Sequence, residues 1–230
     1  MSILLSSCNF FMNNGITSAF QDYRVQYENE SVKILENNQM NVFIFDKNTD
    51  FEVSENKRGN STFYMNTNFF DPNENPIGLV VINKKRKSSR VDRGGYFYVK
   101  NGKSHVSPSC PKNVTFASQS ILIGIKNGRV NKRLTRMNHA KERTYRNIVG
   151  QNNNGDIVII ASKFNGLVTI AEIIEEANKF NLKNAILYDG GSSVDYYFDN
   201  GEFSVGFDSS PKIISKLLSL GEPTTYLTID

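Results

Sequence analysis

The sequence predicts a single α+β domain built on a mixed, mainly antiparallel β core. Three observations predict this fold class. Most apolar segments are short and rich in β-branched and aromatic residues, which is typical of strands. Few segments carry a helical period. Asn-Gly pairs, which favour tight hairpin turns, recur along the chain at Asn14, Asn101, Asn127, Asn154, Asn165 and Asn200.

Strands are expected where apolar runs lie between turn signals. These runs are residues 42–45, 62–65, 79–82, 96–99, 121–125, 148–149 and 157–161. Three Asn-Gly pairs closely follow or separate such runs. We therefore expect β-hairpins at Asn101, Asn127 and Asn154.

One amphipathic helix is predicted over residues 169–181. Its apolar stripe has the i, i+3, i+4, i+7 spacing and consists of Ile170, Ile173, Ile174 and Ala177, continued by Phe180. Thr169 and Glu172 have the spacing of a capping box, which places the helix start at Thr169. The apolar residues 185–188 follow, so a strand, helix and strand succeed one another. If the two strands share a sheet in parallel, their crossover should be right-handed.

A second, shorter helix is predicted over residues 211–219, because Ser210-Pro211 is a typical start and Gly221 a typical stop. No repeat or low-complexity linker divides the chain. We therefore expect one domain over residues 41–230 and an irregular leader over residues 1–40.

The leader contains Leu5-Ser6-Ser7-Cys8, which looks like a bacterial lipobox. However, no basic residue and only a short apolar stretch precede Cys8, unlike a complete signal peptide. Either the true start lies upstream and Cys8 is lipidated at a bacterial cell envelope, or Cys8 is a free thiol of a soluble cytoplasmic or phage-associated protein.

Composition excludes several classes of protein. The chain has 230 residues, of which 39% are hydrophobic, and it contains 16 Phe and 10 Tyr, so global disorder is excluded. No run approaches the length of a transmembrane helix. The two histidines, His105 and His139, and the two cysteines show no metal-ligand spacing, so neither a metal nor another cofactor is expected.

The basic run Lys84–Arg90 could hold nucleic acid or an anionic glycan. A solvated hairpin tip between two strands is the simpler interpretation. The net charge is only +4 and the run has no interleaved aromatic residues, so nucleic-acid binding is disfavoured.

The strongest candidate site is Asp189-Gly190-Gly191-Ser192-Ser193. Here an apolar strand ends in a carboxylate, beside glycines whose backbone can approach a ligand closely. The alternative is a structural turn in which Asp189 caps its own backbone. The doubled glycine and serine after a buried strand favour a site.

Two further groups are candidates. Asn66 and Asn68 would point to one face of a strand and could bind sugar hydroxyls, or they could satisfy the backbone of a turn leading to Asp71. Arg146, beside an apolar strand, could fork onto two phosphate oxygens, or it could be a surface arginine paired with Glu142.

In this order, four segments resemble the phosphodiester glycosidase family. The family pattern is Asn, two small residues and Phe-Phe, then Arg-Thr-Ala-Ile-Gly, a Gly-led helix, and Asn-Ala before a strand ending in Asp-Gly-Gly-Gly-Ser. The matching segments are Asn66–Phe70, Arg146–Gly150, Gly166–Glu172 and Asn184–Ser193, and the resemblance covers roughly residues 40 to 229. The sequence departs from the pattern at Thr67, Asn68, Asn147 and Ser192, so the particular sugar is not implied.

The resemblance implies an enzyme that cleaves a sugar-1-phosphodiester at the anomeric carbon and leaves a phosphomonoester. Its substrate would be a phosphorylated glycan or a sugar phosphodiester, with N-acetylglucosamine among the sugars of the family, in a bacterium or a phage. In that chemistry Asp189 stabilises the oxocarbenium-like centre or activates water, and Arg146 neutralises the leaving phosphate. The expected substrate-binding residues are Asn66, Asn68, Gly190, Gly191, Ser192 and Ser193.

Several points stay open at the level of sequence. A second carboxylate could come from Glu142, Asp71 or Asp195. A non-catalytic glycan-binding or phage virion structural module that retains the fold is an alternative. A nucleic-acid binder that uses residues 84–90 is a third, and steep salt dependence would reveal it.

Overall fold

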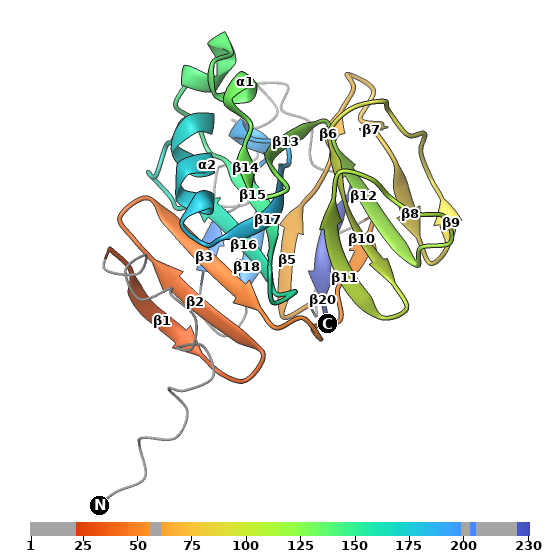
Figure 1. The fold of residues 1–230 in the computed structure, drawn as a ribbon, viewed down its shortest axis with the longest axis horizontal. Coiled ribbons are helices and arrows are strands. Elements are labelled where there is room, and N and C mark those ends of the chain that lie inside the picture. The colour runs from red at the N-terminus through yellow and green to blue at the C-terminus, as the bar shows by residue number, and fades with distance from the viewer. Residues whose placement is uncertain (1–21, 56–60, 199–202, 206–224) are drawn as a thin grey trace, which may run out of the picture.

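The computed structural model describes residues 22–55, 61–198, 203–205 and 225–230. Within these ranges every named strand pair is antiparallel. Helices are few and short, so the predicted mainly antiparallel β core is confirmed (Figure 1). No helix within these ranges is long and apolar enough to cross a membrane.

The largest sheet has eight strands in the order β1-β2-β3-β16-β15-β17-β13-β14. Their bounds are β1 Arg24–Glu28, β2 Val32–Glu36, β3 Met40–Phe45, β13 Leu122–Lys126, β14 Arg129–Val130, β15 Asn147–Asn152, β16 Ile157–Ser162 and β17 Leu182–Leu187. Both faces of its centre are buried. Val42 and Ile44 point into one apolar cluster, and Phe43 and Phe45, one position along, point into another.

Two five-stranded sheets lie against the large sheet, with the orders β11-β10-β12-β8-β9 and β19-β18-β5-β20-β4. The strands of the first are β8 Val80–Ile82, β9 Lys85–Arg86, β10 Gly95–Lys100, β11 Lys103–Ser107 and β12 Phe116–Ser120. Those of the second are β4 Glu52–Ser54, β5 Phe63–Asn66, β18 Tyr196–Phe198, β19 Phe203–Val205 and β20 Tyr226–Ile229. A short hairpin joins β6 Phe69–Phe70 to β7 Pro76–Ile77.

Helix α2, Ile170–Asn178, covers the other face of the large sheet (Figure 1). Both halves of the predicted capping box between Thr169 and Glu172 are present, and the apolar stripe is buried. The helix ends at Asn178, shortly before the predicted end. Three short helices were not predicted: α1 Lys132–Thr135 and the 3-10 turns η1 Asn138–Lys141 and η2 Gly191–Ser193.

The three predicted hairpins are confirmed as β10–β11, β13–β14 and β15–β16. Asn101 and Asn127 have φ angles of 53° and 50°, in the left-handed region that tight hairpin turns require. Strands β16 and β17 share the large sheet and run in the same direction. They are not neighbours, because β15 lies between them and pairs with both.

The expectation of an irregular leader over residues 1–40 is wrong for residues 24–36. They form β1 and β2, because Val32 and Ile34 alternate into the apolar cluster and β2 pairs with β3. The predicted domain boundary at residue 40 stays a prediction. Cys8 and the predicted helix over residues 211–219 lie outside the described residues.

Candidate active site

Three strand ends bring the predicted motifs together. Strand β17 ends just before Tyr188 and Asp189, next to the start of β15, where Arg146 and Asn147 lie. Strand β5 ends at Asn66, whose side-chain amide donates a hydrogen bond of 3.0 Å to the main-chain carbonyl of Asp189. Three segments that are far apart in the sequence therefore meet at Asp189.

The main chain of Asp189 is held on both sides of its Cα. Its N–H donates to the carbonyl of Asn68 at 3.3 Å, and its carbonyl accepts from the amides of Asn66 and Asn147 at 3.0 and 3.3 Å. Because Asn66, Asn68 and Asn147 are buried, the main chain that carries the half-buried carboxylate is held in place.

Burial raises the pKa of the Asp189 carboxyl above its ordinary value. Hydrogen bonds from Ser193 and from the Gly190 N–H, together with the positive charge of Arg146, offset only part of this shift. The Gly190 N–H lies 3.0 Å from Oδ1 of Asp189. Burial therefore makes the ionised form of Asp189 less stable, and a positive charge placed beside the carboxylate would stabilise it.

Arg146 is anchored through its backbone, whose N–H donates to the Ser162 hydroxyl at 2.8 Å. Its half-buried guanidinium makes one long hydrogen bond, of 3.4 Å, to the carbonyl of Glu142. Its Nε is buried and has no hydrogen-bond partner among the described residues. Burial lowers the pKa of Arg146, whereas the negative charges of Glu142 and Asp189 raise it and offset part of this shift. The guanidinium thus keeps donors for a ligand.

Gly190 lies directly against Arg146. A Cβ at this position would lie 3.2 Å from Nη1 of Arg146 and 2.9 Å from the carbonyl oxygen of Tyr145. Glycine therefore allows the Asp189 loop and the arginine to approach each other. No hydrogen bond or ion pair joins the side chains of Arg146 and Asp189 in this part of the described chain, although each carries charge that affects the pKa of the other.

The loop after Asp189 curls into η2. Gly191 has a φ of 65°, and its N–H donates to the carbonyl of Tyr145 at 2.8 Å. The residues Gly190, Gly191, Ser192 and Ser193 are half-buried around the carboxylate. The structure thus places these predicted site residues beside Asp189 and Arg146.

Asn66 and Asn68 do not lie on one face of a strand, so that expectation is wrong. Strand β5 ends at Asn66, and Asn68 has a φ of 53°. Both side chains are 0% exposed. Asn68 accepts from the Ser118 hydroxyl at 2.7 Å and donates to the Gln119 carbonyl at 2.9 Å. The Asn66 amide bonds to Asp189 and Asn147. The two amides therefore join segments that are far apart in the sequence, rather than satisfying the backbone of a turn leading to Asp71, which was the other expectation.

The three candidates for a second carboxylate have different surroundings. Glu142 is exposed, faces His139 at 3.2 Å and acts electrostatically on Arg146. Asp71 accepts from the N–H groups of Asn73 and Asn75 at the β6–β7 turn. Asp195 is 5% exposed and its N–H donates to Oδ1 of Asn66 at 3.1 Å. Glu142 and Asp195 are therefore linked to the site, whereas the Asp71 carboxylate serves a turn.

Sequence reasoning missed Asn147, which it treated only as a departure from a family pattern. Its buried side-chain amide donates to Oδ1 of Asn66 at 2.9 Å as well as to the carbonyl of Asp189. The sequence could have indicated this role, because Asn147 directly follows Arg146 and begins an apolar strand.

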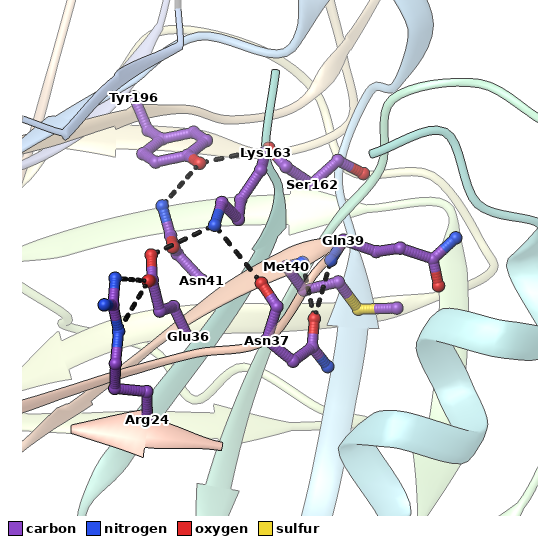
Figure 2. Close-up of polar contacts among 9 residues, drawn as sticks. All are labelled: Arg24, Glu36, Asn37, Gln39, Met40, Asn41, Ser162, Lys163 and Tyr196. Atoms are coloured by element: carbon purple, nitrogen blue, oxygen red, sulfur yellow. Dashed lines mark hydrogen bonds and ion pairs between the residues drawn. The ribbon is translucent and has the colours of Figure 1, made fainter. Parts of the chain in front are cut away.

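Sequence reasoning also missed a polar network around Ser162, the residue that binds the Arg146 N–H; Figure 2 shows this network. The Tyr196 hydroxyl accepts from the Asn41 amide at 3.2 Å and donates to the Ser162 carbonyl at 3.0 Å. The next residue, Lys163, pairs with Glu36 at 3.0 Å. Residues Ser162 and Lys163, at the end of β16, are thus linked to β2 through Glu36 and to β3 through Asn41.

Arg143 is engaged elsewhere. It forms an ion pair with Glu172 at the start of α2 and donates to the carbonyl of Leu167 at 2.8 Å. Among the described residues, no group of three or more His, Cys, Asp or Glu side chains could hold a metal ion. The described site thus contains the half-buried carboxylate of Asp189 and the guanidinium of Arg146, whose Nε has no hydrogen-bond partner there.

Comparison with known proteins gives one match by family and several by structure. A family model described as phosphodiester glycosidase matches residues 59–214. No curated protein matches the sequence. The fold is similar to the zebrafish N-acetylglucosamine-1-phosphodiester alpha-N-acetylglucosaminidase catalytic domain auto-inhibited by its pro-peptide, with a TM-score of 0.64, 13% identity, and coverage of 90% of this chain and 81% of that chain.

A hypothetical protein from Synechocystis is also similar, with a TM-score of 0.54 and 11% identity over 90% of this chain and 61% of that one. At such identities the structural likeness shows the fold alone. The family match covers more than half of the chain.

Proposed function

The chain belongs to the phosphodiester glycosidase family, and we propose that it is a hydrolase that cleaves a sugar-1-phosphodiester at the anomeric carbon, freeing the sugar and a phosphomonoester. The observation that carries this proposal is the pair formed by Asp189 and Arg146. Their side chains lie on adjoining loops without pairing to each other, and Arg146 has a buried donor that no described group uses.

In this proposal Asp189 acts on the sugar. Cleavage at the anomeric carbon develops positive charge on the ring, as in other glycoside hydrolyses. Burial penalises the charge of the Asp189 carboxylate more than its hydrogen bonds and Arg146 stabilise it, so the carboxylate gains from a cationic transition state beside it. It would stabilise that centre or activate the attacking water.

Arg146 acts on the leaving group. A phosphate monoester is a weak base, so its departure needs charge neutralisation more than protonation. The planar guanidinium can offer two parallel donors to phosphate oxygens, which Lys cannot do. Because Nε is buried, the donors for this role are the terminal nitrogens, of which Nη1 lies beside Gly190 and Nη2 makes a long hydrogen bond to the Glu142 carbonyl.

The remaining predicted residues divide into two groups. Gly190, Gly191, Ser192 and Ser193 form the wall next to the reacting atoms, because they surround the carboxylate and are only half-buried. Asn66 and Asn68 act by positioning the Asp189 backbone, Asn66 through its side-chain amide and Asn68 through its main-chain carbonyl, and both residues are buried.

The test is a screen for release of free sugar from nitrophenyl-phospho-sugars and UDP-sugars. The parent protein is compared with Asp189→Asn and with a control, Asp50→Asn, at an exposed aspartate. We expect turnover by the parent and the control and its loss in Asp189→Asn. Saturable sugar binding without turnover by the parent would instead favour a non-catalytic glycan-binding or virion module.

A further inference from the structure

Positive charge is concentrated in one part of the chain. Residues 79–120 contain nine Lys or Arg and one Asp, a net charge of +8 against +4 for the whole chain, so all other residues together carry −4. This segment forms the β11-β10-β12-β8-β9 sheet and its loops. The modest overall charge therefore conceals a strongly basic sheet.

Strand register places several of these groups on one outer face. Lys100 lies opposite Lys103, and Tyr98 opposite His105, whereas the intervening Phe97 and Val99 point into the core. The same register continues through Ala117 and Val81 to Arg86. Ala117 and Val81 are buried in an apolar cluster that also includes Cys110 and against which Tyr98 packs, so this face is open only around that cluster. We call the outer face formed by Arg86, Arg90, Tyr98, Lys100, Lys103 and His105 the basic face.

Aromatic rings accompany the charges on this face. The rings of Tyr98 and His105 stack with centroids 4.9 Å apart and an interplanar angle of 26°. The guanidinium of Arg90 lies over the Tyr96 ring, 5.1 Å from its centroid. The folded sheet thus supplies the aromatic partners that the linear run 84–90 lacks.

The cations of the basic face have no acidic partners in the described ranges. Arg86 and Arg90 donate to the main-chain carbonyls of Ser88 and Cys110, and neither Lys100 nor Lys103 forms an ion pair there. In the same sheet Lys87 does pair, with Glu55 at 2.9 Å. Uncompensated charge of one sign attracts a polyanion.

This sheet is connected to the candidate active site. The Gln119 side chain donates to the carbonyls of Val91 and Arg93, at 2.7 and 2.9 Å, and its backbone carbonyl accepts from Asn68. Asn68 in turn accepts from the Asp189 N–H. The exposed Arg93 therefore stands on a loop joined to Asp189 through two residues, and Figure 1 shows β10 and β11 beside β17.

We propose that the basic face binds an anionic glycan polymer whose sugars are joined through phosphodiesters, and that it holds this polymer while sugars are released at Asp189. This inference rests on the proposed function. Regularly spaced phosphates would meet the Lys and Arg side chains, and sugar rings would pack on the Tyr98–His105 pair. A nucleic acid would also meet both the charges and the rings, because its bases stack on aromatic side chains. The sugar-phosphodiester polymer is favoured because the site proposed at Asp189 acts on sugar phosphodiesters.

The chain offers a matched control for the test. Lys100 and Lys103 flank the Asn101-Gly102 turn, and Lys126 and Arg129 are paired in the same way across the Asn127-Gly128 turn of the large sheet. The double variants Lys100→Glu/Lys103→Glu and Lys126→Glu/Arg129→Glu make the same change in net charge at two equivalent hairpins.

The probe is a soluble polymer of N-acetylglucosamine 1-phosphate, compared with an oligo-dT of equal charge and a neutral chitin oligosaccharide. We expect the parent to prefer the polymer, with affinity that falls as salt rises. The Lys100/Lys103 variant should bind the polymer about tenfold more weakly or worse, and the Lys126/Arg129 variant within about twofold of the parent. Equal weakening in both variants, tighter binding of oligo-dT, or no polymer binding by the parent overturns the proposal.

Kinetics separate this inference from the proposed function. The ratio of kcat/KM for the polymer to that for a monomeric UDP-sugar should fall in the Lys100/Lys103 variant and stay at the parental value in the control. Polymer binding that follows the expected pattern without any sugar release would contradict the proposed hydrolase but not the basic face. Release from UDP-sugar without polymer binding would contradict the basic face alone.

Discussion

The side chain of Asn147 holds the main chain of Asp189, with its Nδ2 atom 3.3 Å from the Asp189 carbonyl oxygen. The same nitrogen lies 2.9 Å from Oδ1 of Asn66, which also accepts from the Asp195 N–H. Since Arg146 directly precedes Asn147, one short segment supplies the guanidinium and positions the loop that carries the carboxylate. The two candidate catalytic groups are therefore fixed relative to each other by a buried amide.

Asn147→Ala should destabilise the protein and lower turnover. It removes the donor shared by two buried oxygens, which costs about 1–3 kcal/mol of unfolding free energy. The measurement is denaturant unfolding, together with turnover per folded molecule. Asn153→Ala, at an exposed asparagine, is the control and should change stability by less than about 0.5 kcal/mol. A variant as stable and as active as the parent would show that this amide positions nothing.

Arg146→Lys should keep the fold and lose about 10²-fold or more in turnover on phosphodiesters, as when one preorganised donor to a transition state is removed. Lys retains the charge but not the forked geometry. Arg143→Lys is the matched control, because Arg143 is occupied by Glu172 and the Leu167 carbonyl. Its turnover should stay within a fewfold of the parent. If the two variants behaved the other way round, Arg143 would be the phosphate ligand.

Features set by neighbouring residues could be predicted from the sequence. The α2 helix begins at Thr169 because its capping box and its apolar stripe lie within one segment. The hairpins at Asn101 and Asn127 likewise depend on two-residue turns. The same reasoning selected Asp189 and Arg146 because each adjoins an apolar strand.

Features set by distant contacts could not be predicted in this way. Asn68 leaves the strand geometry because its amide bonds to Ser118 and Gln119, some fifty positions along the chain. Asn147 gains its place only when β5 and β17 end beside it. The basic face exists only through the register of β10 and β11, which brings Tyr98 and His105 together.

Gly190→Ala should lower both turnover and stability. Gly190 has a φ of −109°, which alanine adopts without strain, but the new Cβ would stand 3.2 Å from Nη1 of Arg146 and 2.9 Å from the Tyr145 carbonyl. The Tyr145 backbone has to shift, and Arg146 with it, and a displacement of this kind costs about 10- to 100-fold in rate. Single-turnover rates and melting temperatures on one preparation check this. Parental rates would show that the close approach of Gly190 to Arg146 is not needed.

The pH dependence of turnover should report the raised pKa of Asp189. If the ionised carboxylate is the active form, kcat/KM falls on the acid side at a pH above the ordinary aspartate value of about 3.9. Ser193→Ala removes a hydrogen bond that lowers this pKa, so the acid limb should move to higher pH. Ser109→Ala, at an exposed serine, is the control and should leave the limb in place.

The stability of the protein gives an independent check on Asp189, because its charge is proposed to be needed for turnover but to lower the free energy of unfolding. Because the folded-state pKa of Asp189 is raised, its contribution to stability is most favourable below the unfolded-state pKa and is lost as pH rises through the folded-state pKa. Asp189→Asn removes a buried charge that costs free energy at neutral pH, so the variant should melt at or above the parental temperature there while losing most of its turnover. If Asp189 only caps its own loop, the variant should instead lose about 1–3 kcal/mol and keep parental turnover per folded molecule, which would contradict its catalytic assignment.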